Sequence, residues 1–93
     1  MIRLNCFVSV KPENRNEVLE AARRLTAASL KQGGCIAYDI FESATRPDVL
    51  MFCETWRDQE SLDAHATSDV FIKETKIIHD LADLKIERLS FDR

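Results

Sequence analysis

Residues 2–10 alternate between apolar and polar side chains, which is the period of a strand with one buried face. The apolar positions are Ile2, Leu4, Cys6, Val8 and Val10. The other face mixes polar and aromatic groups, and we expect it to line something; it carries Arg3, Asn5, Phe7 and Ser9.

A helix is expected to follow this strand. Asn14 is its candidate N-cap, Glu17 is the capping-box partner three residues later, and Gly33-Gly34 should end the helix. Two further strand patterns, 35–43 and 49–56, flank a short turn, so they predict an antiparallel hairpin.

The last third of the chain predicts two helices and a closing strand. Asp58 can cap a short helix that extends to Ala66, and Ser68 or Asp69 can cap a second one that runs to about Ala82. Residues 84–91 alternate again, which is typical of a strand.

This β-α-β-β-α-β order predicts a single α+β domain over residues 1–93 with the ferredoxin-like arrangement. Helices on one face of the sheet would leave its other face open. We expect Phe7, Phe52 and Trp56 to make that open face too apolar for water, and a second copy of the chain to cover it. The expected assembly is a homodimer with two-fold symmetry.

Composition narrows the class of protein. The chain has 93 residues and a net charge of −3, from 13 basic and 16 acidic side chains, which argues against a nucleic-acid binder. It is too short to hold a Rossmann, P-loop or flavin fold. No apolar run could span a membrane, and the alternating first residues are unlike a signal peptide, so we expect a cytoplasmic protein. Cys6, Cys35 and Cys53 are widely spaced and odd in number, which favours reduced thiols and argues against a zinc site.

Four motifs follow one another with short connections. They are Gly33-Gly34-Cys35-Ile36-Ala37-Tyr38-Asp39, Glu54-Thr55-Trp56-Arg57-Asp58, Leu62-Asp63-Ala64-His65 and Ser68-Asp69-Val70-Phe71. Over nearly the whole chain this series resembles the antibiotic biosynthesis monooxygenase (ABM) family. The resemblance implies a dimeric α+β barrel. Members include cofactor-free monooxygenases that form quinones from phenols with O₂, haem-degrading monooxygenases, and isomerases that process a breakdown product of a phosphorylated autoinducer sugar.

The resemblance also separates these branches. Haem-degrading members use an Asn in the first strand, a Trp at the end of the third strand and a His on the late helix. Asn5 and Trp56 match the first two, but Thr75 stands where the His would be, and His79 lies one turn further. We therefore expect no haem and no other cofactor. His65 matches a His that is common in the quinone-forming and isomerase-like members.

His65 is the strongest catalytic candidate. A neutral imidazole can take a proton from a phenol or an enol near pH 7, because its unperturbed pKa is about 6.5. Packing at a helix end is the alternative. Glu54 shares its strand face with Trp56 and would be costly to bury alone, so it should either pair with Arg3 or Arg88 or carry a proton at a raised pKa.

The other candidates are one amide and four aromatic side chains. Asn5 could donate to a substrate carbonyl or to negative charge developing on oxygen, or form a cross-strand hydrogen bond. Aromatic walls suit an aromatic ligand, and the candidate substrate-binding residues are Trp56, Phe71, Tyr38 and Phe7. Packing in the core or at the dimer interface is the alternative for Trp56, and packing against the helices is the alternative for Tyr38. His79 is expected to be a solvated surface residue.

The expected function is that of a cofactor-independent monooxygenase that oxidises a small phenol or hydroquinone with O₂. His65 would be the base, and Asn5 would stabilise the oxygen anion. Two alternatives stay open. One is an enzyme that isomerises or degrades a small keto compound with His65 and Glu54 as acid and base. The other is a binding module without catalysis, for haem or another small ligand.

Overall fold

The structure, a computed structural model, describes residues 1–92; Arg93, the last residue of the expected 1–93 domain, lies outside the described residues. The elements in chain order are β1 (Ile2–Val10), a 3-10 turn (Pro12–Asn14), α1 (Arg15–Ser29), β2 (Cys35–Glu42), β3 (Val49–Trp56), α2 (Gln59–Ala66), α3 (Asp69–Leu81) and β4 (Ala82–Ser90). This order confirms the ferredoxin-like α+β architecture.

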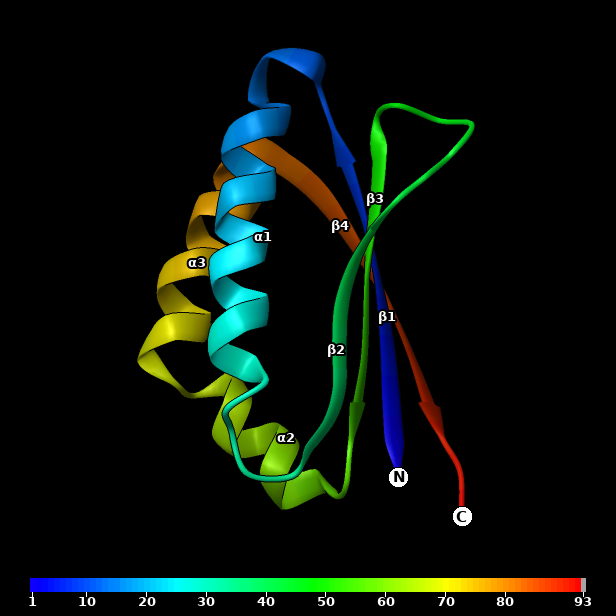
Figure 1. The fold of residues 1–93 in the computed structure, drawn as a ribbon, viewed down its shortest axis with the longest axis vertical. Helices are drawn as coiled ribbons and strands as arrows, with labels where there is room; N and C mark the ends of the chain where they lie inside the picture. Colours follow the sequence, from blue (N-terminus) through cyan, green and yellow to red (C-terminus); the bar gives the residue numbers. More distant parts are fainter. Residues whose placement is uncertain (93) are drawn as a thin grey trace.

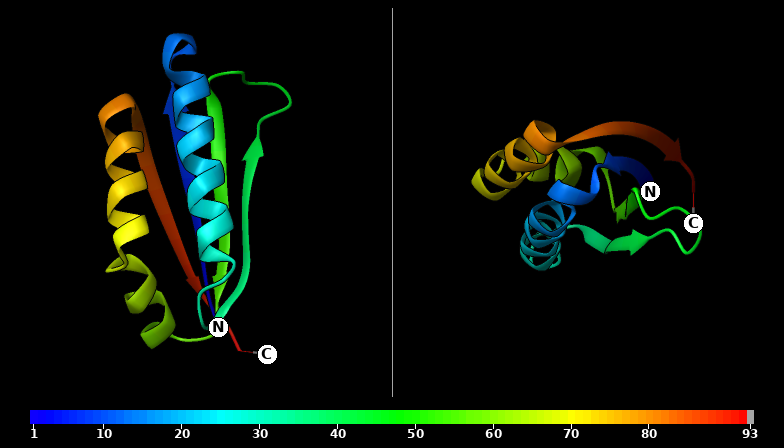
Figure 2. Two further views of the ribbon diagram at one scale, coloured as in Figure 1. Left: turned by 60° about the vertical axis from the view of Figure 1, so that its left-hand side comes forward. Right: turned by 90° about the horizontal axis from the view of Figure 1, so that it is seen from above.

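The strands form one antiparallel sheet in the order β2-β3-β1-β4. The helices α1, α2 and α3 all lie on the same side of this sheet, with α2 across one end (Figure 1). Figure 2 shows the two layers from other directions, with β2 and β4 at opposite edges of the sheet. The molecule is therefore a two-layer domain with one covered and one open sheet face.

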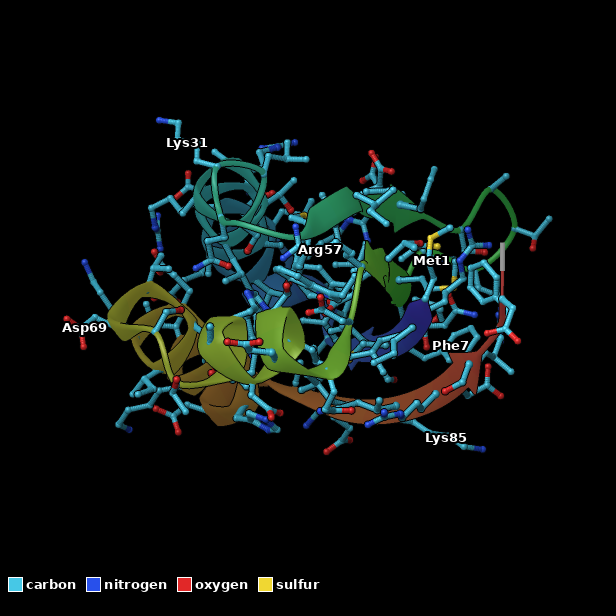
Figure 3. All side chains as sticks on the ribbon, turned by 90° about the horizontal axis from the view of Figure 1, so that it is seen from below. Met1, Phe7, Lys31, Arg57, Asp69 and Lys85 are labelled. Atoms are coloured by element: carbon cyan, nitrogen blue, oxygen red, sulfur yellow. The ribbon has the colours of Figure 1, made fainter. Side chains whose placement is uncertain are left out.

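Residue parity divides the sheet into these two faces. The register pairs Leu4 with Glu54 and Cys6 with Phe52, so the even-numbered residues of β1 and β3 share a face. That face lies under the helices, because its side chains are buried: Ile2, Cys6, Val8, Val10, Leu50, Phe52, Glu54 and Trp56. The odd-numbered residues point the other way, and Phe7 lies on the side away from the helices (Figure 3).

The expected composition of the open face is wrong in part. Phe7 lies there, but Phe52 and Trp56 are only 3% and 0% exposed beneath the helices. Alternation separates the two faces of a strand, yet aromatic residues occur on both, so the pattern does not say which face the helices cover. Half-buried Phe7 and Met51 still make the open face apolar, and Phe41 on the same face is 50% exposed.

The late helices begin at the expected caps. Asp58 Oδ1 accepts from the backbone N–H of Ser61 at 2.8 Å, and Ser68 caps α3 in the same way. The expectation for Asn14 is wrong, because its side chain makes no capping hydrogen bond. The 3-10 turn runs directly into α1, so the backbone at Asn14 is already in the right-handed helical region, and its amide donates to the carbonyl of Leu81.

Gly34 lies in the loop before β2 and makes a close contact with the first turn of α2. Its φ of +79° lies in the left-handed region, where an L side chain is strained. A Cβ added to Gly34 would lie 2.0 Å from Oγ of Ser61. The Gly34 carbonyl accepts from the backbone N–H of Arg57 at 2.8 Å. The backbone of the loop before β2 therefore packs against a side chain in the first turn of α2.

None of the helices within residues 1–92 combines the length and the apolar character that a membrane span requires.

Candidate active site

A cavity of about 320 Å³ lies between the covered sheet face and the helices α2 and α3. Its inner wall is mainly apolar, from residues such as Leu4, Cys6, Phe52, Leu62, Phe71 and Ile78. Tyr38, Glu54 and His65 add polar atoms to the interior. An apolar pocket with few convergent polar groups is typical of a site for a small organic ligand.

His65 occupies the centre of the site. It lies near the end of α2 and is only 1% exposed. Three aromatic rings surround it: Trp56 at 4.5 Å, Phe71 at 4.9 Å and Tyr38 at 5.5 Å between ring centroids. Nδ1 lies 2.7 Å from Oε1 of Gln32, whereas buried Nε2 has no hydrogen-bond partner. A buried polar atom without a partner is unusual, and in a residue that lines a cavity it is a candidate contact for a ligand.

Glu54 lies beside His65 on β3. Its Oε1 accepts from Nε1 of Trp56 at 2.9 Å and is 3.9 Å from Nε2 of His65. The expected arginine partners are engaged elsewhere. Arg3 donates to Oγ1 of Thr55 on the open face, and the Arg88 guanidinium donates to Gln59. Glu54 is thus a buried carboxyl group held by an indole rather than by a cation.

Burial shifts both titratable groups toward their uncharged forms. It lowers the pKa of His65 to about 4. It also raises the pKa of Glu54, although hydrogen bonding from Trp56 and Tyr38 opposes part of that rise. His65 is therefore a neutral imidazole at neutral pH. A negatively charged ligand beside it would favour the imidazolium, so protonation and ligand ionisation are coupled.

The structure brings most of the candidate residues together, but not all of them. His65, Glu54, Tyr38 and Phe71 line the cavity. Trp56 does not line it and packs behind His65 as a fully buried residue. Asn5 and Phe7 occupy odd positions of β1 and lie on the open face, so they do not meet His65.

Sequence reasoning missed several residues of the site. Gln32 is the hydrogen-bond partner of His65, from the loop after α1. His79 is exposed, as expected of a surface residue, but it also lines the cavity, together with Arg88 of β4. Gln32 has no periodicity or motif that could have marked it. The position of Arg88 on the same face as Glu54 follows from the register across β1, which places both opposite Leu4.

Within residues 1–92, no group of three or more His, Cys, Asp or Glu side chains is arranged to hold a metal ion. The three cysteines form no disulfide. Burial raises the pKa of the Cys6 thiol to about 11, so this cavity-lining residue stays a thiol at neutral pH.

Known proteins resemble this chain in sequence and in structure. Residues 1–73 match the family model described as "Antibiotic biosynthesis monooxygenase". The protein named "Putative monooxygenase YcnE" from Bacillus subtilis (strain 168) is 34% identical over 65 residues, which cover 70% of this chain and 68% of that protein.

Two solved structures extend the similarity to the whole domain. One is a conserved protein of unknown function from Bacteroides thetaiotaomicron VPI-5482, described as a "Possible Oxidoreductase". It is 53% identical with a TM-score of 0.95, over 97% of this chain and 96% of that one. The other, described as an antibiotic biosynthesis monooxygenase, is 25% identical with a TM-score of 0.91 over the full length of both chains.

Proposed function

This chain belongs to the antibiotic biosynthesis monooxygenase family, and from its cavity we propose that it is a cofactor-independent monooxygenase that oxidises a small phenol or hydroquinone with O₂. The observation that carries this proposal is the buried, unpartnered Nε2 of His65 in a mainly apolar cavity of about 320 Å³. Family membership supports the reaction class, and the cavity supports a small, flat, largely apolar substrate.

The proposed chemistry begins with proton transfer. Nε2 of His65 takes the proton of a phenolic hydroxyl, and the resulting imidazolium stabilises the phenolate as an ion pair. The low pKa of about 4 for His65 in the free protein reflects burial, and a phenolate in contact would raise it. An electron-rich phenolate can pass an electron to O₂, whereas a neutral phenol does so poorly. The substrate therefore supplies the reducing electrons.

The remaining steps balance without a further reductant. The substrate radical and superoxide combine at a ring carbon and form a C–O bond. The O–O bond then breaks, the ring carbon loses its hydrogen as a proton, and the distal oxygen leaves as water. A phenol and O₂ thus give a quinone and water. In this proposal Glu54, 3.9 Å from Nε2 of His65, returns a proton to the leaving oxygen.

Oxygen uptake tests this proposal. The wild-type protein should consume O₂ with at least one member of a panel of naphthols, hydroquinones and anthrone-type compounds, and His65→Ala should reduce the rate by about 10²–10⁴-fold. Stoichiometric quinone and an unchanged rate after chelator treatment are expected. Failure of the wild type to exceed the blank with every compound would overturn the proposal.

The His65–Glu54 pair also favours a second candidate, an isomerase or degrading enzyme for a small keto compound. A buried carboxyl group and a neutral imidazole 3.9 Å apart in one cavity can move a proton between neighbouring carbon or oxygen atoms of a ligand. Turnover under argon distinguishes the two functions. Isomerisation survives the removal of O₂, whereas monooxygenation stops.

The third candidate, binding without turnover, rests on His79, which lies one turn beyond Thr75, the position where the family resemblance places a haem-binding His. Both residues line the cavity. Haem titration followed by absorbance tests the haem version: a saturable Soret shift that is lost in His79→Ala would favour it over both enzymatic functions.

We also propose that the working unit is a homodimer joined through the open sheet face. The family resemblance implies a dimeric barrel, and this face bears apolar side chains, from half-buried Phe7 and Met51 to Phe41. Asn5 fits this surface better than the cavity, because its Oδ1 is buried without a partner on the same face. Sedimentation velocity should find a dimer at micromolar concentration; a monomer would contradict the assembly.

A further inference from the structure

Gln32 and Ser68 form a hydrogen-bond chain behind His65. Nε2 of Gln32 donates to Oγ of Ser68 at 3.2 Å, and Oγ of Ser68 donates to the backbone carbonyl of His65 at 2.6 Å. Oε1 of Gln32 lies 2.7 Å from Nδ1 of His65. The chain starts and ends on the same residue and links the loop after α1 to the break between α2 and α3.

The backbone carbonyl of His65 determines the direction of every hydrogen bond in this network. A backbone carbonyl can only accept, so the single hydroxyl proton of Ser68 points to the carbonyl of His65. Oγ of Ser68 must then accept from its remaining neighbours, which are the amide of Gln32 and the backbone N–H of Phe71. Gln32 therefore turns its NH₂ group toward Ser68 and its oxygen toward His65.

The oxygen of Gln32 can only accept, which decides the proton position on the imidazole. Nδ1 of His65 must carry the proton, and Nε2 must carry the lone pair. Nε2 is the nitrogen that lies 3.9 Å from Glu54 and has no hydrogen-bond partner. The basic nitrogen is thus the one on the Glu54 side of the ring.

We propose that Gln32, held by Ser68, is a positioning residue that fixes the tautomer of His65, so that Nε2 stays the unprotonated base. This inference rests on the proposed function for its effect on turnover, but the tautomer itself is a property of the free protein. Free histidine in water favours the opposite tautomer, with the proton on Nε2. Without Gln32, the nitrogen beside the substrate would more often carry a proton and could not accept one.

The experiment compares three variants with the wild type. Gln32→Leu removes both the acceptor and the donor at similar volume. Gln32→Glu keeps an acceptor for Nδ1. Lys31→Leu is the matched control, because the adjacent Lys31 side chain is exposed and points away from the helices and the sheet (Figure 3). Two-bond ¹H–¹⁵N spectra of the labelled protein report which ring nitrogen is protonated, and the His79→Gln spectrum assigns the two histidines.

The expected spectra show Nδ1–H for His65 in the wild type, in Gln32→Glu and in Lys31→Leu. Gln32→Leu should shift His65 toward Nε2–H and lower kcat on the order of tenfold, with little change in KM, while Gln32→Glu restores most of the turnover.

Nε2–H in the wild type, or an unchanged tautomer in Gln32→Leu, would overturn the inference. If Gln32→Leu does not fold, the wild-type spectrum alone decides. The result of the tautomer experiment is independent of the result of the O₂-uptake test. Absence of O₂ uptake refutes the monooxygenase without touching the tautomer, and the wrong tautomer refutes the role of Gln32 even if O₂ is consumed.

Discussion

Oε1 of Glu54 lies 3.9 Å from Nε2 of His65, and both side chains are buried beneath the helices of a two-layer domain. The pair has no arginine or lysine partner among residues 1–92. Its protonation is therefore governed by burial and by whatever ligand enters the cavity, and this makes the pair testable by pH and by substitution.

Turnover should persist to unusually acidic pH for a histidine base. Burial lowers the pKa of His65 to about 4, so the imidazole stays neutral well below its ordinary value of 6.5. The acid limb of kcat/KM, which reports the free enzyme, should therefore have its midpoint near pH 4. Stopped-assay rates between pH 3.5 and 8 measure this limb. A midpoint near pH 6.5 would show that His65 is solvated or is not the base.

Folding stability should fall between pH 6.5 and 4 because of His65. The unfolded state binds a proton at about pH 6.5 and the folded state only near pH 4, so acidification favours the unfolded chain in this window. A shift of this size is worth about 3 kcal/mol once both states are titrated. Glu54 acts in the opposite direction, because its raised pKa makes the folded state bind its proton first as the pH falls. Urea unfolding at several pH values should show a weaker acid dependence in His65→Gln.

Glu54→Gln should separate proton transfer from packing. Glutamine keeps an oxygen that can accept from Nε1 of Trp56, so the fold and near-UV circular dichroism should be unchanged. If Glu54 returns a proton in the reaction, kcat should fall by about 10²-fold. If the folded Glu54→Gln protein keeps the wild-type kcat, Glu54 transfers no proton and serves only as a hydrogen-bond acceptor for Trp56.

The two adjacent glycines should respond oppositely to alanine. Gly34→Ala places a side chain at φ +79° and 2.0 Å from Oγ of Ser61, so it should lower the free energy of unfolding by more than the 1–2 kcal/mol of backbone strain alone. Gly33→Ala is the matched control. A Cβ there meets nothing within 4 Å, so it should be neutral or stabilise by about 0.4–1 kcal/mol. Equal effects in urea denaturation would argue against the close contact with α2.

Phe7→Lys should weaken self-association. The substitution puts a charge on the apolar open face without touching the cavity, since Phe7 is not among its lining residues. Ile72→Lys is the matched control, because Ile72 is 57% exposed on α3, on the other side of the molecule. Sedimentation velocity should show a raised dissociation constant for Phe7→Lys alone. A loss of association in Ile72→Lys would show that the dimer interface involves the helices rather than the open sheet face.

Most of the fold could be predicted from the sequence. Period-two patterns marked the strands, and short polar caps such as Asp58 and Ser68 marked the late helices, because these signals are local. Asn14 does not cap α1, because it is the last residue of the 3-10 turn Pro12–Asn14 and its backbone is already in the right-handed helical region.

The sequence predicts residues of the site only where their type or a motif marks them. Residue type and motif point to His65, Glu54, Tyr38 and Phe71, and all four line one cavity. Gln32 lies 33 positions from His65 in the sequence, and a contact between a loop residue and a helix residue leaves no pattern in either segment. The prediction that Asn5 meets His65 is wrong, because alternation defines the two faces of β1 without saying which of them the helices cover.

The parity of β1 and β3 has a consequence for how this protein can be altered. Even positions such as Cys6 face the cavity, and odd positions such as Phe7 face the opposite side. Neighbouring residues therefore affect different properties: ligand binding on one face and self-association on the other. A complete substitution scan of these two strands should yield effects on turnover and on self-association that alternate residue by residue. A one-residue insertion in β1 would exchange the two sets of side chains and should abolish both properties at once.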